Sequence, residues 1–118
     1  MQDPRKLLVW QKSHRLAVDI HRLTERWSRR DHGALISQSR RAALSIPSNI
    51  CEGCGRETKA DLARFLQIAI GSADELEYQI EFAGEIGLLP SAVSGETRSR
   101  IIEIRRMLIG LRRRVKAT

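Results

Sequence analysis

Residues 62–83, LARFLQIAIGSADELEYQIEFA, carry the clearest pattern in this chain of 118 residues. Their apolar side chains recur at alternating steps of four and three, so they share one face of an α-helix. That face consists of Leu62, Leu66, Ala69, Ala73, Leu76, Ile80 and Ala83. Phe65, Phe82 and Ile86 widen the same face. Such spacing is typical of helices that pack nearly in line with one another, so this stretch predicts one member of a helical bundle.

Three other stretches have helical periodicity, and no segment alternates as a β-strand does. Their apolar faces consist of Val9, Leu16, Ile20, Leu23 and Trp27; of Leu35, Ser39, Ala42, Ile46 and Ile50; and of Ile101, Ile104, Leu108, Leu111 and Val115. We therefore expect one domain over residues 1–118, with helices over about 8–29, 33–53, 58–87 and 94–116. Short connections make sequential helices antiparallel, which predicts an all-α, antiparallel up-down-up-down four-helix bundle.

Local signals mark where these helices begin and end. Thr58 followed by Asp61 resembles a capping box, with Asp in place of the usual Glu. Ser94 is a candidate N-cap for the last helix. Gly53 and Gly55 allow the backbone to turn just before the third helix. These residues set the expected boundaries between the second, third and fourth helices.

Pro47 lies inside the expected second helix. A proline there removes one backbone hydrogen bond and clashes with the preceding turn, at a cost of about 3 kcal/mol. The apolar register nevertheless continues from Ile46 to Ile50. We therefore expect a Pro-kinked second helix, in which Ser48 and Asn49 bond the carbonyl groups that the proline leaves without a donor.

Positive charge is concentrated near the end of the chain. The formal net charge is +7, yet residues 1–97 contain as many acidic as basic side chains. The excess lies in residues 98–118, where Glu103 alone stands against Arg98, Arg100, Arg105, Arg106, Arg112, Arg113, Arg114 and Lys116. Such asymmetry fits a polyanionic partner such as nucleic acid. It fits equally a solvated basic helix face that aids solubility.

The last helix also predicts a contact between copies of the chain. At about 100° per residue, Ile102 and Ile109 lie about 120° from the core face, among arginines. Two apolar residues exposed in this way predict an oligomer interface. Acidic Glu77, Glu81 and Glu85 flank the apolar face of the third helix and complement the arginines, within one chain or between chains. Arginines paired in this way are not available for phosphate.

The sequence contains no catalytic or metal-binding constellation. Cys51 and Cys54 have the spacing of a redox or zinc pair, but no second pair completes a site. The carboxylates of the third helix lack the Glu-x-x-His pattern of metal sites in bundles. We therefore expect no enzyme, metal, cofactor or small-molecule substrate. No stretch approaches the roughly 18 apolar residues of a membrane span and no signal peptide opens the chain, so we expect a cytoplasmic protein.

Several motifs occur together in this chain. They are LVWQK at 8–12, QSRRAA at 38–43, SIPSNI at 45–50, EG at 52–53, GR at 55–56 and RFLQIA at 64–69. Over residues 7–111 this set resembles the 23S rRNA intervening-sequence proteins, also called the S23 ribosomal protein family. The resemblance implies a four-helix bundle without enzymatic activity, some members of which are encoded in inserts within ribosomal RNA genes. Cys51, Cys54 and the arginine-rich last turn depart from the family pattern.

That family is similar to the accessory variability proteins of diversity-generating retroelements. Those proteins are pentameric barrels that bind nucleic acid and a reverse transcriptase. The resemblance therefore implies a homopentamer, with RNA or DNA and a reverse transcriptase as candidate partners.

Taken together, these features predict a non-catalytic, oligomeric accessory protein that binds nucleic acid. Its candidate phosphate-binding residues are Arg98, Arg105, Arg106, Arg112, Arg113, Arg114 and Lys116, with Arg40 and Arg41 from the family motif. A structural role is expected for Pro47, Asn49, Glu52, Gly53, Gly55 and Arg56. Arg40, Arg41 and Arg56 could equally brace the proline through Glu52 or backbone carbonyls. The alternative is an assembly scaffold that binds another protein and no nucleic acid.

Overall fold

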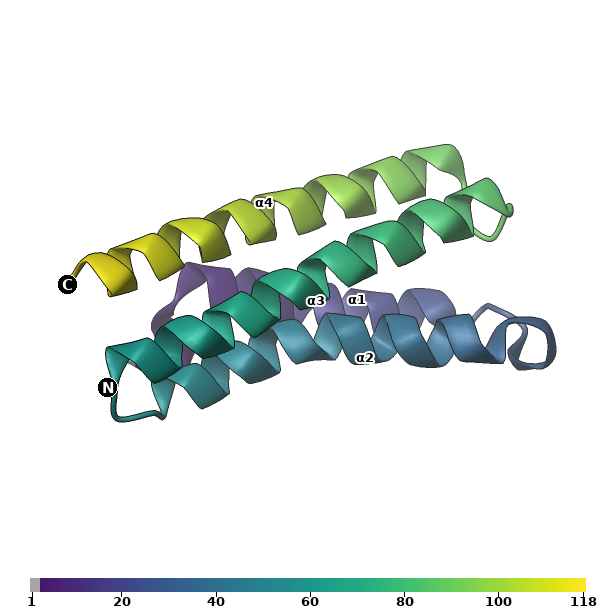
Figure 1. Cartoon of the computed structure of the whole chain (residues 1–118). Helices are drawn as coiled ribbons and strands as arrows, with labels where there is room; N and C mark the ends of the chain where they lie inside the picture. Colours follow the sequence, from purple (N-terminus) through teal and green to yellow (C-terminus); the bar gives the residue numbers. More distant parts are fainter. Residues whose placement is uncertain (1–2) are drawn as a thin grey trace.

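The computed structural model describes residues 3–118; residues 1 and 2 of the expected domain lie outside the described part. Nearly all of it is helical (Figure 1). The helices are α1 (Leu8–Thr24), α2 (Arg29–Cys54), α3 (Lys59–Glu85) and α4 (Ser91–Ala117), preceded by a single 3-10 turn at Pro4–Lys6. The described residues contain no strand, so the predicted all-α four-helix bundle is confirmed.

The four helices are not packed equally against one another. α2 and α3 pack along their lengths, as do α3 and α4, whereas α1 packs mainly on α2 and meets α4 only briefly. The backbones of α2 and α4 do not approach each other as those of neighbouring helices do, so these two helices lie diagonally across the bundle. Figure 1 shows the α2–α3 turn and the C-terminal end of α4 at the same end of the bundle. The first turns of α3 therefore lie beside the last turns of α4.

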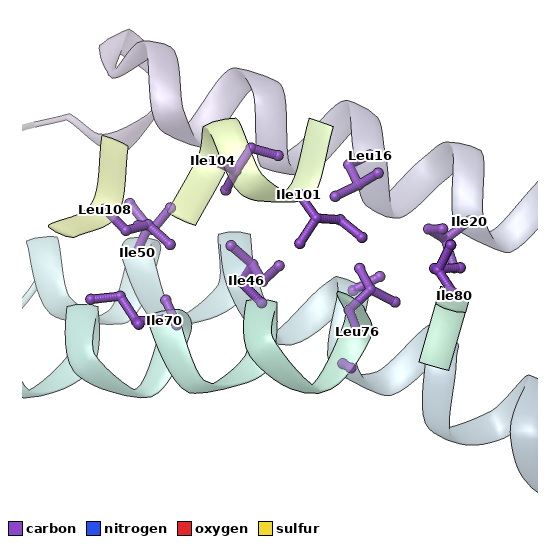
Figure 2. Close-up of a cluster of buried hydrophobic side chains, with 14 of the residues drawn as sticks. Leu16, Ile20, Ile46, Ile50, Ile70, Leu76, Ile80, Ile101, Ile104 and Leu108 are labelled. Carbon is purple, nitrogen blue, oxygen red and sulfur yellow. The ribbon is translucent and has the colours of Figure 1, made fainter. Parts of the chain in front are cut away.

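The core is a single cluster to which all four helices contribute (Figure 2). Its largest side chains are at most 1% exposed: Leu16, Ile20, Ile46, Ile50, Leu66, Leu76, Ile80, Ile101, Ile104 and Leu108. Full burial of one such side chain stabilises the fold by about 1.5–3 kcal/mol. All ten belong to the faces predicted from the spacing of apolar residues, which is why the fold follows from that spacing.

Three residues of the predicted faces lie elsewhere. Phe82 and Ile86 are 41% and 45% exposed, because the face that ends at Ala83 already fills the side of α3 toward the bundle. In α2, Ile36 is buried whereas Leu35 is only half-buried. The widened face predicted for the third helix was therefore wrong at its C-terminal end.

The first helix ends at Thr24 rather than near residue 29. The Thr24 hydroxyl donates to the Ile20 carbonyl at 2.8 Å within the last turn, and the chain then leaves the helix. Ser28 begins α2, and its hydroxyl accepts a hydrogen bond from the backbone N–H of Asp31 at 3.2 Å. Within α2 only His32 has non-helical angles (φ −132°, ψ 27°), so the regular helix starts at about the expected place.

Of the two N-caps expected for α3 and α4, one is confirmed and the other is wrong. Thr58 does cap α3, because its hydroxyl accepts from the backbone N–H of Asp61 at 3.1 Å. Ser94 does not cap α4, which already begins at Ser91 after Pro90. The Ser94 hydroxyl instead donates to the carbonyl of Ile80 at 3.4 Å and so joins α4 to α3.

α2 continues through Pro47, which is buried. The Asn49 amide donates to the Ser45 carbonyl at 2.8 Å and to the Ser45 hydroxyl at 2.9 Å. The carbonyl that the proline deprives of its donor is that of Ala43, so Asn49 supports the neighbouring part of the helix. The Ser45 and Ser72 hydroxyls, 2.7 Å apart, then link this segment to α3.

Gly53 and Gly55 were expected to let the backbone turn before α3, but their roles in the structure are different. Gly55 ends α2 at a φ of −85°, which any residue adopts. Gly53 lies inside α2, where a Cβ atom would stand 2.9 Å from Leu62 Cδ1 and 3.0 Å from Phe65 Cβ of α3. Gly53 is therefore needed for the close approach of two helices. Among the described residues, a positive φ occurs at Gly87 alone.

Candidate nucleic-acid interface

The arginines of α4 fall into two groups according to their neighbours. Arg98 lies 3.2 Å from Glu81 and 3.6 Å from Glu77 of α3. Arg105 lies 3.1 Å from Asp74 and also donates to Glu77. The hydrogen bond to Glu77 raises the pKa of Arg105 above its ordinary value, while partial burial acts against this rise. Both arginines are therefore neutralised within the subunit.

Two further ion pairs join α4 to α1. Arg100 lies 3.0 Å from Asp19, and Lys12 lies 2.9 Å from Glu103. These side chains are partly exposed, so each pair stabilises the fold by no more than about 1 kcal/mol. Residues 91–105 of α4, which we call the paired half, thus present no arginine without a carboxylate neighbour.

The rest of α4, residues 106–117, is different, and we call it the basic half. Within residues 3–118, none of its cationic side chains lies within 4.0 Å of a carboxylate. These side chains are Arg106, Arg112, Arg113, Arg114 and Lys116. All are exposed except the half-buried Arg112. This half of α4 therefore carries the unneutralised charge of the helix.

A groove of about 620 Å³ runs between the basic half of α4 and the start of α3. Its cationic lining consists of Lys59, Arg64, Arg112 and Lys116. No acidic side chain belongs to the described lining, which is completed by Ala60, Ala63, Gln67, Val115 and Thr118. We call this feature the basic groove. The α3 lysine and arginine were not among the candidate residues, because only the fold brings them beside α4.

Two arginines flank the ring of Phe65 near this groove. The guanidinium of Arg64 lies 4.7 Å from the ring centroid, and that of Arg56 lies 4.8 Å from it. Arg56 also lies 3.3 Å from Glu52, the partner that the motif suggested. Contacts between a guanidinium and an aromatic ring contribute about 0.5–1 kcal/mol at exposed sites, so the ring helps to fix both arginines in place.

The structure does not bring Arg40 and Arg41 together with the basic half. They lie on α2, which is diagonally opposite α4 in the bundle. Arg40 donates to the Thr24 hydroxyl at 2.8 Å and to the His21 carbonyl at 3.2 Å, so it supports the end of α1. Arg41 is exposed and has no ion pair within the described chain.

The premise of the expected oligomer interface needs correction. Ile102 and Ile109 are half-buried rather than exposed, and Ile109 packs against the core cluster. A projection of one helix ignores its neighbours, whereas α1 and α3 flank α4 and shield its sides. The exposed large apolar side chains are instead Leu8, Leu44, Ile68, Tyr78, Phe82 and Ile86. Of the acidic partners, Glu85 makes no ion pair among residues 3–118.

The cysteines do not form a site. Cys51 is exposed and Cys54 is buried, and both are unbridged. Burial raises the pKa of the Cys54 thiol, so this side chain is a poor nucleophile. Across residues 3–118, no group of three or more His, Cys, Asp or Glu side chains is placed to hold a metal ion. No helix in this range is both long and apolar enough to cross a membrane.

The class that these features define is a helical bundle with a basic groove between its last two helices. A model of the 23S rRNA-intervening sequence protein family matches residues 5–110, so the chain belongs to that family. It is similar in structure to a protein of unknown function from the S23 ribosomal protein family of Bacteroides thetaiotaomicron VPI-5482. That chain is 25% identical, with a TM-score of 0.81 over 88% of this chain and 97% of the other. A search of curated proteins finds no match.

Proposed function

We propose that this protein is a non-catalytic accessory protein that binds the phosphate backbone of nucleic acid in the cytoplasm. The observation that carries the proposal is the basic half of α4, whose five cationic side chains have no carboxylate neighbour within the described chain. The cations of α3 in the basic groove extend the same positive surface. Arg98, Arg100 and Arg105 do not belong to this interface, because acidic side chains already neutralise them.

Binding of this kind has a defined physical signature. Each phosphate that a lysine or arginine neutralises releases counterions, so affinity falls steeply with salt. Phosphate contacts fix the position of the nucleic acid but do not read its sequence. We therefore expect a strong salt dependence and little sequence preference.

Assembly is the second part of the proposal. The family resemblance implies a homopentamer, and α3 with its C-cap Ile86 exposes apolar side chains suited to an interface, the others being Tyr78 and Phe82. A ring of subunits would repeat the basic half around an axis and add the fields of the copies. The molar mass in solution, measured by light scattering, tests this part: the mass of a lone 13.4 kDa chain would contradict it.

The binding proposal is tested by removing the charges of the basic half. The triple variant R112Q/R113Q/R114Q is titrated with a labelled single-stranded RNA at two salt concentrations, and fluorescence anisotropy reports the affinity. We expect a loss of at least about ten-fold, and a salt slope smaller by about 2, because each lost phosphate contact removes about 0.7 from the slope.

The matched control is R26Q/R29Q/R30Q, which removes the same charge from exposed arginines at the opposite end of the bundle. It should retain most of the affinity of the unaltered protein. Equal losses in the two triple variants would show that net charge alone attracts the RNA. A complete lack of binding at low salt would instead favour the scaffold alternative, in which the exposed side chains of α3 bind another protein.

A further inference from the structure

We infer that the basic groove binds one single strand of nucleic acid, with phosphates at its cationic side chains and an unpaired base against its apolar ones. This inference rests on the proposed function, because it names the form of nucleic acid that the same site prefers. It differs from that function in assigning a role to the apolar lining and in predicting discrimination between a single strand and a duplex.

The lining of the groove has two chemical parts. Lys59, Arg112 and Lys116 supply positive charge, whereas Ala60 and Val115 supply apolar surface. A double helix offers its phosphates to a protein surface but keeps its bases stacked inside. An unpaired base instead exposes an apolar face that gains from contact with side chains. The apolar part of the lining is therefore useful only to a strand whose bases are accessible.

The size of the groove fits such a ligand. Its volume of about 620 Å³ lies within the range of about 300–1,000 Å³ that is usual for sites that hold a small molecule. A nucleotide of a flexible strand can enter a space of this kind. The backbone of a duplex is held at the radius of the double helix, so it contacts the rim alone.

Arg64 is placed to stack on a base. Its guanidinium carbon lies 4.7 Å from the centroid of the Phe65 ring, and the Arg64 side chain is 61% exposed. Unpaired bases in protein complexes stack on arginine planes as well as on aromatic rings. The nearest carboxylate, that of Asp61, lies 4.0 Å from Arg64 Nε, at the limit of an ion pair. The arginine thus lies over the ring, and its one ion pair is long, with both side chains exposed to solvent.

Arg112 supplies a second preorganised group. Its Nε atom is shielded from solvent and has no hydrogen-bond partner among the described residues. Arg112 is half-buried where it lines the groove, so its neighbours restrict the positions that its side chain can take. On the opposite wall, the Lys59 ammonium donates to the Thr118 backbone oxygen at 3.2 Å, which holds the start of α3 beside the end of α4. Both walls of the groove are therefore ordered before the strand arrives.

The test compares a single-stranded RNA of about 16 nucleotides, the upper site size of single-strand-binding folds, with a duplex of the same length. The duplex carries twice as many phosphates, so attraction by charge alone favours it. We expect the unaltered protein to bind the single strand more tightly at the same salt concentration. Tighter binding of the duplex would overturn the inference while leaving the proposed function intact.

A groove-filling variant adds a second readout. Ala60 is exposed, and A60L fills the apolar part of the groove without changing any charge. It should weaken single-strand binding by about ten-fold, as expected for the loss of one base contact, and weaken duplex binding clearly less. The matched control is A92L, which places the same side chain on an exposed position of the paired half.

Circular dichroism melting of both variants verifies that they fold. Equal single-strand affinities in A60L and A92L would overturn the inference. If neither nucleic acid binds the unaltered protein even at low salt, the proposed function fails as well, and the two failures are thereby distinguished.

Discussion

Both halves of α4 contain arginines, but the fold gives those arginines different electrostatic surroundings. Arg98, Arg100 and Arg105 in the paired half each lie within 4.0 Å of a carboxylate, whereas the cations of the basic half have none among the described residues. The formal net charge of +7 counts all of them alike. The comparison shows that a basic segment becomes a candidate binding surface only where the fold leaves its charges unneutralised.

Most of this difference comes from α3, because only Arg100 takes its partner, Asp19, from α1. Asp74, Glu77 and Glu81 lie in its second half, whereas its first turns carry Lys59 and Arg64 against Asp61. Because α3 and α4 are antiparallel, the acidic half of α3 meets the first half of α4, and its basic start meets the end of α4 (Figure 1). The topology thus pairs opposite charges at one end of the molecule and collects like charges at the other.

The largest expected difference between the halves concerns the core. Ile101 of the paired half is 0% exposed, whereas Leu111 of the basic half is half-buried. I101A should lower the free energy of unfolding by about 2–5 kcal/mol, because it leaves a cavity among fully buried neighbours. L111A should cost clearly less. Urea denaturation measures both values, and equal losses would show that the two halves are packed alike.

A smaller effect on stability is expected when a glycine at each half is replaced by alanine: Gly84 of α3, which faces the paired half, and Gly110 within the basic half. A Cβ atom on Gly84 would stand 3.1 Å from Ser94 Cβ in the paired half, so G84A should cost about 1–2 kcal/mol by pushing the helices apart. In the basic half, a Cβ on Gly110 meets nothing closer than Arg114 at 3.6 Å. G110A should therefore stabilise the protein by about 0.5–1 kcal/mol, because alanine favours a helix over glycine. Thermal melts of the two variants should shift in opposite directions.

The smallest effect is expected from a substitution that makes the paired half resemble the basic half. Glu77 contacts both Arg98 and Arg105, so E77Q should release part of their charge toward solvent. The RNA affinity should rise by a few-fold, and the salt slope should grow by up to about 1 for each new phosphate contact. E96Q is the control, because it removes the same charge from an exposed residue of α4. If E77Q and E96Q raise the affinity equally, the ion pairs of the paired half do not restrain its arginines.

The helices and most of the core could be predicted from sequence because they depend on local periodicity. The stripe from Leu62 to Ala83 needs no knowledge of its neighbours to show which side is buried. The end of α1 at Thr24 was missed, since Trp27 continues the helical spacing although the chain has left the helix.

The candidate site was harder to predict, because it depends on contacts between helices. Lys59 and Arg64 are separated from the basic half by about half of the chain, so no local motif links them to Arg112. The exposure expected for Ile102 was wrong for the same reason, since flanking helices shield it. Ion pairing was foreseen for Glu77 as one possibility, but which arginines it reaches depends on the register of α3 against α4.

Because α1 and α4 meet only briefly, we expect the molecule to open first between them. At the surface their seam carries the ion pairs of Lys12 with Glu103 and of Arg100 with Asp19, which salt screens. Amide hydrogens of α1 should consequently exchange with deuterium before those of α3, and added salt should widen the gap in rates. On this expectation α1 separates from the bundle before the other helices open, and α2, α3 and α4 form the slowly exchanging part of the protein.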